Sequence, residues 1–338
     1  MKRWLPLASI LVLLFLTVVA GAWQHYQRFL QLPLEIEQSG LELTVERGAS
    51  IRSVVLELER RGITRMDWRW RVLNRLQPLT IKAGEYALKP FMTPPDLMDM
   101  LASGKVINYR FTIIEGWTAA QLIIALGKDP VLQHTVAPTS GLTGLAGFQD
   151  SNPEGWFLPE TYVFERGDSD LQILKRAHGA MQEALAQAWS GRAMGLPYET
   201  SYELLIMASI VEKETSRKSE RAAIAGVFVR RLLKKWRLET DPTVIYGMGE
   251  SYRGNIRRRD LNHDTAYNTY TRHGLPPTPI ALPGLASLVA AAHPAAGEAM
   301  FFVADGQGGH TFSSTLEAHG KAVKQLLERN ARKQDSRE

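Results

Sequence analysis

The longest apolar run lies at the start of the chain. Residues 5–22 carry no charge, they follow the cationic start MKR, and a tryptophan stands on each side, at Trp4 and Trp23. A helix between these tryptophans would be about 28 Å long, close to the hydrocarbon thickness of a bilayer. Because tryptophan favours both membrane interfaces and positive charge stays on the cytoplasmic side, residues 1–23 are predicted to form a transmembrane anchor with a cytoplasmic N-terminus.

A cleaved signal peptide is the alternative interpretation of this run. Residues 20–22 read AGA, which has the small-x-small form of a cleavage site. The run is long for such a peptide, and cleavage would leave the tryptophan pair without a role. Both interpretations place the rest of the chain outside the cytoplasm, in the cell envelope.

The next part of the chain predicts a polar juxtamembrane connector over residues 24–40 and then a small α+β module over residues 41–112. LELTV alternates as a half-buried strand does. Caps and turn residues delimit the elements that follow. These are a helix between Ser50 and Gly62, a helix over 67–76, a hairpin around Gly84, a helix from Thr93 to Gly104, and a strand over 106–114.

Residues 113–333 predict a larger α+β domain, with a tail at 334–338. Residues 129–152 and the stretch after Leu238 are rich in turn residues, and MFFVADG reads as a strand. Helical periodicity predicts helices over 115–127, 168–191, 201–216, 219–236, 284–293 and 315–333. The expected fold class is therefore α+β, with an N-terminal transmembrane helix, a small module and a larger domain.

Composition removes several kinds of chemistry. The chain has 338 residues, no cysteine and a net charge of +5. The absence of cysteine excludes disulfides, thiolate metal sites and cysteine nucleophiles. The histidines have no metal-ligand spacing, residues 306–310 read as a glycine turn, and no GxSxG motif occurs. We expect no metal and no cofactor, and the mild basic excess does not choose a partner.

The most informative helix is ELLIMASIVEKET, residues 203–215. On a helical wheel Glu214 falls in the middle of the arc formed by the apolar side chains, whereas Glu212 and Lys213 fall on its flank. Burial resists ionisation and raises a carboxyl pKa, as a general acid near neutral pH requires. A solvated last-turn position for Glu214 is the structural alternative, and the flanking polar residues are expected on a solvated face.

Several runs resemble the YceG-like (MltG-type) endolytic peptidoglycan transglycosylases over nearly the whole chain. These runs are EGWFLPETYVF, ASIVEKET, ERAAIAGVFVRRL, LETDPTVIYGMG, TAYNTYTRHGLPPTPIALPG, AAAHPA and FFVADGQGGHTFSSTLEAH. The resemblance implies a LysM-like module at 41–112 and a catalytic domain at 113–333. It also implies a single-pass inner-membrane protein whose catalytic part is periplasmic.

The implied reaction cuts the β-1,4 bond between N-acetylmuramic acid and N-acetylglucosamine in nascent glycan strands. It leaves 1,6-anhydro-N-acetylmuramic acid ends and limits strand elongation. In lytic transglycosylases the catalytic glutamate precedes Ser or Thr, which assigns Glu214 before Thr215, with Glu212 as the fallback. The substrate-binding candidates are Glu160, Thr240, Asp241, Tyr267, Asn268 and Tyr270.

The implied partners are peptidoglycan glycan strands, the membrane and peptidoglycan synthases, with no nucleic acid. Two other functions stay open at this point. A non-catalytic scaffold would bind glycan and recruit synthases through the module and the anchor alone. An ordinary glycan hydrolase would give reducing ends, and its product would be one water heavier than an anhydro end.

Overall fold

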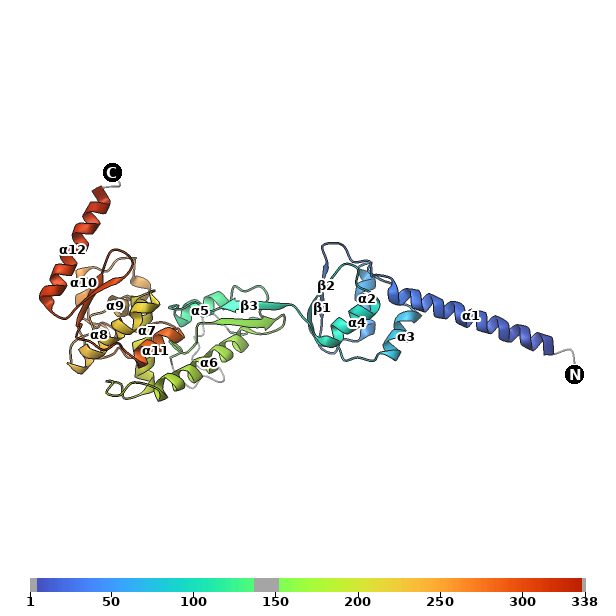
Figure 1. Ribbon diagram of the computed structural model, residues 1–338, viewed down its shortest axis with the longest axis horizontal. Coiled ribbons are helices and arrows are strands. Elements are labelled where there is room, and N and C mark those ends of the chain that lie inside the picture. Colours follow the sequence, from blue (N-terminus) through green and yellow to red (C-terminus); the bar gives the residue numbers. More distant parts are fainter. Residues whose placement is uncertain (1–4, 137–151, 336–338) are drawn as a thin grey trace. The chain divides into compact units, whose positions relative to one another are not determined.

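The computed structural model of the chain describes residues 5–136 and 152–335 (Figure 1). The chain divides into two compact units. Unit 1 comprises Met1–Tyr109 and Val163–Gly167, and unit 2 comprises Arg110–Tyr162 and Asp168–Glu338. The division falls within β3 (Asn108–Thr112) and β4 (Thr161–Glu165), which pair in a two-stranded sheet. Each unit mixes helices and strands, as the predicted α+β class requires.

The N-terminal apolar run forms α1 (Leu5–Gln31). Its segment Ser9–Gln31 is long and apolar enough to cross a membrane, and its large apolar side chains from Ile10 to Trp23 lie on the surface. Trp4 lies outside the described residues. The helix continues through the start of the predicted 24–40 connector, because Tyr26 and Phe29 fall on one helix face and are buried in unit 1. Because residues 24–40 are polar in composition, the sequence pattern does not reveal this amphipathic turn.

In the chain order of unit 1, two helices separate two strands that pair antiparallel with each other. Strand β1 (Leu41–Val45) pairs with β2 (Gly84–Leu88) so that Leu41 lies opposite Leu88. The predicted hairpin around Gly84 is wrong, because Gly84 starts β2 and its partner strand lies some forty residues earlier in the chain. Gly84 has φ +142°, and a Cβ there would lie 2.5 Å from Val106 Cγ1. Its role is close backbone packing rather than a turn.

The three helices of unit 1 that follow α1 begin where the sequence predicts them. They are α2 (Ile51–Arg60), α3 (Trp68–Leu76) and α4 (Pro94–Ser103). Ser50 and Thr93 form capping boxes, Asp67 caps α3, and Gly104 ends α4 with φ +64°. Each cap satisfies backbone groups that a helix end leaves free. The core between them contains Leu58, Trp70, Tyr86, Leu97 and Leu101.

Unit 2 is built around α7 (Ser201–Glu214), in which every residue from Leu204 to Glu212 is buried. Helices α6, α8, α9 and α11 pack against it. The sequence predicts one apolar stripe on this helix, whereas in the structure the helix is covered on all sides. Besides α7, unit 2 contains α5 (Ala119–Leu126), α6 (Asp170–Ser190), α8 (Arg221–Leu233), α9 (Asp241–Met248), α10 (Arg258–Asn262) and α11 (Leu285–Ala292).

The region after Leu238 is less irregular than its sequence suggests. It contains the short helices α9 and α10, which Pro242 and the surrounding turn residues hid from a periodicity argument. The chain ends in β5 (Phe301–Ala304), β6 (His310–Ser313) and α12 (Leu316–Asp335). Strands β5 and β6 pair antiparallel, so the glycine turn predicted at 306–310 is confirmed.

The core of unit 1 generates a stability prediction. Leu58 is fully buried in α2, whereas Leu56 on the same helix is 37% exposed. Leu58→Ala is expected to lower the free energy of unfolding by about 2–5 kcal/mol, because it removes buried methyl groups and leaves a cavity. The matched Leu56→Ala should change it by about 0.5 kcal/mol or less. Hydrogen exchange of unit 1 amides measures both, and equal losses would contradict this core assignment.

Candidate functional site

Glu214 is the last residue of α7 and follows the buried part of that helix. Its carboxyl group is surrounded by protein atoms, while part of the residue stays accessible to solvent. Burial raises its pKa to about 7, and the nearby Asp241 carboxylate acts in the same direction. Half of such carboxyl groups hold a proton near neutral pH. The wheel position predicted for Glu214 is thus compatible with an acid that a ligand can reach.

Thr240 and Asp241 bring the start of α9 to this carboxyl group. The Thr240 hydroxyl donates a short hydrogen bond to Glu214 Oε1, and Thr240 is itself buried. Its own backbone N–H donates to Thr269 Oγ1 at 3.1 Å. The hydrogen bond from Thr240 favours the ionised form of Glu214, so it opposes the larger effect of burial.

Tyr270 completes this cluster from the loop that follows α10. Its hydroxyl donates to Asp241 Oδ1 at 2.6 Å. Burial raises the pKa of Tyr270 far above its usual range, so the hydroxyl keeps its proton and remains a donor. Four of the predicted site residues therefore form one hydrogen-bonded chain, in the order Glu214, Thr240, Asp241 and Tyr270, with Asp241 joined to Thr240 through the backbone.

Arg231 and His310 lie close enough to influence Glu214. Arg231 donates Nε to the Met300 carbonyl at 2.8 Å and Nη1 to the Leu238 carbonyl at 2.7 Å. His310 places Nδ1 2.7 Å from Glu220 Oε2. Both groups lower the pKa of Glu214, but less than burial raises it. The site thus holds a protonatable carboxyl group near the guanidinium of Arg231.

Glu212 has a different environment, and the prediction that it lies on a solvated face is wrong. Its Oε1 lies 2.8 Å from Arg221 Nη2. Its Oε2 accepts hydrogen bonds from Gly284 N at 3.0 Å and Ser287 Oγ at 2.8 Å. These partners lie on α8 and at the start of α11. Glu212 therefore ties three helices together, and both of its oxygens are engaged by protein groups.

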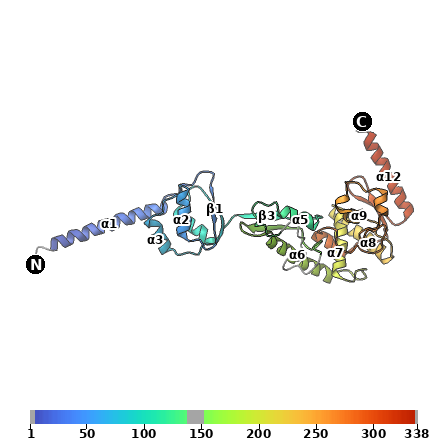
Figure 2. The same cartoon turned by 180° about the vertical axis from the view of Figure 1, so that it is seen from behind.

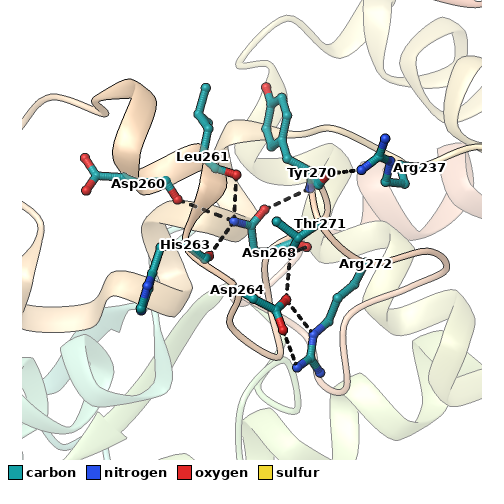
Figure 3. A network of polar contacts seen from close by, with 9 residues as sticks. All are labelled: Arg237, Asp260, Leu261, His263, Asp264, Asn268, Tyr270, Thr271 and Arg272. Carbon is teal, nitrogen blue, oxygen red and sulfur yellow. Dashed lines mark hydrogen bonds and ion pairs between the residues drawn. The ribbon is translucent and has the colours of Figure 1, made fainter.

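Asn268 is buried at the centre of the loop between α10 and Tyr270 (Figure 3). Its Nδ2 group donates to the carbonyls of Leu261 and His263 at 3.0 and 2.7 Å. Its Oδ1 accepts the Tyr270 N–H at 2.8 Å. Because the amide is engaged by the backbone, Asn268 shapes the loop that presents Tyr270 rather than offering itself to a ligand.

Two further candidates lie elsewhere. Glu160 is exposed, and its Oε2 accepts the Thr161 N–H at 3.3 Å. None of the contacts in the described ranges joins Glu160 to Glu214. Tyr267 pairs its hydroxyl with Thr278 Oγ1 at 2.9 Å, and its ring meets that of Tyr246 edge to face at 4.9 Å. The structure thus connects Tyr267 to the far end of α9 instead of its start.

Glu154 is a second unusual carboxyl group, and the sequence argument missed it. It is 4% exposed, and burial raises its pKa to about 7. Its Oε1 accepts the N–H of Ala119 at the start of α5, and its Oε2 accepts the Tyr246 hydroxyl of α9 at 3.1 Å. A single acid among the apolar residues of EGWF is the sequence signal that could have revealed it.

The comparisons with known proteins agree with one another. The model of the YceG-like family matches residues 43–325. The chain is 26% identical over 330 residues to the endolytic murein transglycosylase of Bacillus subtilis (strain 168), covering 92% of this chain and 91% of that protein. It is 25% identical to the protein of that name from Streptococcus pneumoniae (strain D39), and the match covers 63% of that longer relative.

A solved structure is similar as well. The crystal structure of a yceG-like protein from Listeria monocytogenes superposes with a TM-score of 0.54 at 27% identity. The match covers 84% of this chain and 99% of that one. Because the family model spans most of the residues and both units, this chain belongs to the YceG-like family.

Proposed function

We propose that this chain is an endolytic murein transglycosylase whose general acid and base is Glu214. The observation that carries the proposal is a reachable carboxyl group with a pKa of about 7 at the end of a buried helix. The names of the relatives supply the substrate class, which is the glycan strand of peptidoglycan. The bond that breaks is the β-1,4 link between N-acetylmuramic acid and N-acetylglucosamine.

One carboxyl group suffices for this reaction because it acts twice. Protonated Glu214 donates its proton to the glycosidic oxygen, the C1–O bond breaks, and an oxocarbenium-like state develops at the muramyl C1. The Glu214 carboxylate then takes the proton of the C6 hydroxyl, whose oxygen attacks C1 of the same sugar. No water is consumed, and closing a ring within one sugar benefits from a high effective molarity.

The start of α9 holds this acid in place. Thr240 fixes Oε1, and among the described residues no hydrogen bond engages Oε2. We assign the transferable proton to Oε2. Asp241 supplies a negative charge that keeps the pKa of Glu214 high and favours positive charge on the sugar, while Tyr270 orients Asp241. Glu154 supports the other part of α9 through Tyr246.

The remaining assignments concern location and the small module. The surface-exposed apolar helix α1 and the cationic start MKR support a single-pass inner-membrane anchor with the catalytic part in the periplasm. The compact arrangement of β1, α2, α3 and β2 supports a LysM-like module. A role in limiting strand elongation next to peptidoglycan synthases follows from an endolytic cut near the membrane.

Glu214→Gln is expected to lower the release of anhydro ends from glycan strands by about 10²–10⁴-fold, because glutamine cannot donate the proton. Glu203→Gln is the matched control, since Glu203 lies in the first turn of the same helix, and it should keep the activity. Mass spectrometry of the digests measures both. Release of anhydro ends at the normal rate would remove Glu214 from the mechanism, and reducing ends would indicate a hydrolase.

The pH profile of kcat/KM provides a second test. The reaction needs the protonated acid, so activity should be full well below pH 7 and fall about tenfold for each pH unit above it. Thr240→Val removes a hydrogen bond to the carboxylate and should move this decline to higher pH. Asp241→Asn removes a like charge and should move it to lower pH.

Glu154 needs a control in that experiment because its pKa is also about 7. Glu154→Gln should leave the midpoint of the alkaline decline unchanged if Glu214 is the titrating acid. A midpoint that vanished with Glu154→Gln, and that did not respond to Thr240→Val or Asp241→Asn, would transfer the acid role to Glu154.

Glu212→Gln distinguishes the fallback acid from a structural residue. Removing one partner of the buried pair with Arg221 is expected to lower the free energy of unfolding by roughly 3–5 kcal/mol. The protein that remains folded should still release anhydro ends. Denaturant unfolding and activity per folded molecule measure the two effects. A stable but inactive Glu212→Gln protein would make Glu212 the acid instead of Glu214.

A further inference from the structure

Helix α1 passes from full exposure into the core of unit 1 without a linker. Trp23 is 60% exposed, whereas Tyr26 and Phe29, within the next two turns, are buried. The helix is continuous from Leu5 to Gln31. If α1 crosses the membrane, as the proposed function requires, unit 1 must lie directly on the membrane surface. The inference below rests on that anchor.

Helix α3 lies beside the point where α1 enters unit 1. The ring of Trp68 is 6.3 Å from the rings of both His25 and Tyr26, and Trp70 meets Phe29 edge to face at 5.2 Å. Figures 1 and 2 both show α3 on the side of unit 1 from which α1 extends. Trp68 therefore lies about one helical turn beyond Trp23 along α1.

The outer face of α3 combines apolar side chains with free cations. Trp68 is 43% exposed and Leu76 is 64% exposed. Arg71 and Arg75, spaced to lie on the same face, are also exposed, and no hydrogen bond or ion pair engages them within the described part of the chain. Arg69, by contrast, is paired with Asp67 at 2.5 Å. Aromatic, aliphatic and arginine side chains together are typical of helices at a membrane interface.

A hollow of about 730 Å³ adjoins this face. Arg52, Arg71 and Arg75 line it together with apolar side chains, and its lining contains no acidic residue. The apolar lining residues are Ile51, Met66, Trp70 and Pro78. The hollow beside β1 and α2 differs, because Glu46 and Glu57 lie there with the arginines. Three cations around an apolar floor fit an anionic headgroup and the first carbons of a lipid.

We propose that the outer face of α3 rests on the phospholipid surface and that this hollow takes the headgroup of an anionic phospholipid. The face is defined by Trp68, Arg71, Arg75 and Leu76, with Arg52 across the hollow. Each arginine near an anionic surface strengthens association roughly fivefold. Contact of both α1 and α3 with the membrane fixes the orientation of unit 1 on the bilayer. An anchor through α1 alone would leave unit 1 free to rotate about the axis of that helix.

The cysteine-free chain allows a direct test on the full-length protein. Leu76→Cys carries an environment-sensitive fluorophore on the α3 face. Ser103→Cys carries it at the exposed end of α4, a helix that is not part of that face. Both proteins are reconstituted into phosphatidylcholine vesicles with or without phosphatidylglycerol, and lipids brominated near the headgroup quench a probe that touches the bilayer. Flotation and carbonate extraction report separately on insertion of α1.

The expected result is strong quenching at position 76 and little at position 103. Phosphatidylglycerol should increase the quenching, and Arg71→Glu with Arg75→Glu should abolish that increase while cleavage of soluble glycan strands is unchanged. Normal insertion of α1 together with equal quenching at positions 76 and 103 would overturn this proposal and leave the membrane anchor intact. Failure to insert would overturn the anchor and the proposal with it. A probe that responds to glycan strands but not to brominated lipid would make the face a glycan site and also overturn it.

Discussion

The structure of the site depends on the free-energy cost of ionising Glu214 where α7 leaves the core. An isolated buried carboxylate is costly, so the group resists ionisation until a partner compensates it. The Thr240 hydroxyl donates a hydrogen bond to the carboxyl group, and Arg231 and His310 act in the same direction, but burial outweighs them. Because α6, α8, α9 and α11 cover α7, the helix cannot turn this residue into solvent without disturbing the core of unit 2. The packing of the helices therefore sets the acidity.

Glu212 shows what the same helix does with a carboxyl group that it uses structurally. It lies two residues from Glu214, on nearly the opposite side of the helix, yet it receives a guanidinium, a backbone N–H and a hydroxyl. Both of its oxygens are engaged by protein groups. Two acids on one buried helix thus separate into a cross-link and a carboxyl group with a raised pKa because their partners differ in number.

The sequence predicts those features that depend on interactions between residues close together in the chain. Helix caps at Ser50 and Thr93 lie where the sequence predicts them, and periodicity predicts that Glu214 lies among apolar side chains of α7. Pairings between distant segments were not predictable in this way. The strand partner of Gly84, the burial of Glu212 beside Arg221 and the contact of Glu154 with Tyr246 all depend on which surfaces meet after folding.

Helix α9 connects the two carboxyl groups with raised pKa values. Its start carries Thr240 and Asp241 next to Glu214, and Tyr246, further along, donates to Glu154. Glu154 in turn accepts the first N–H of α5, so the position of α9 is tied to a second helix. A shift of α9 would change the surroundings of both acids together. The acidity of Glu214 is for this reason a property of the assembled unit, and a short helix that the sequence pattern did not reveal controls it.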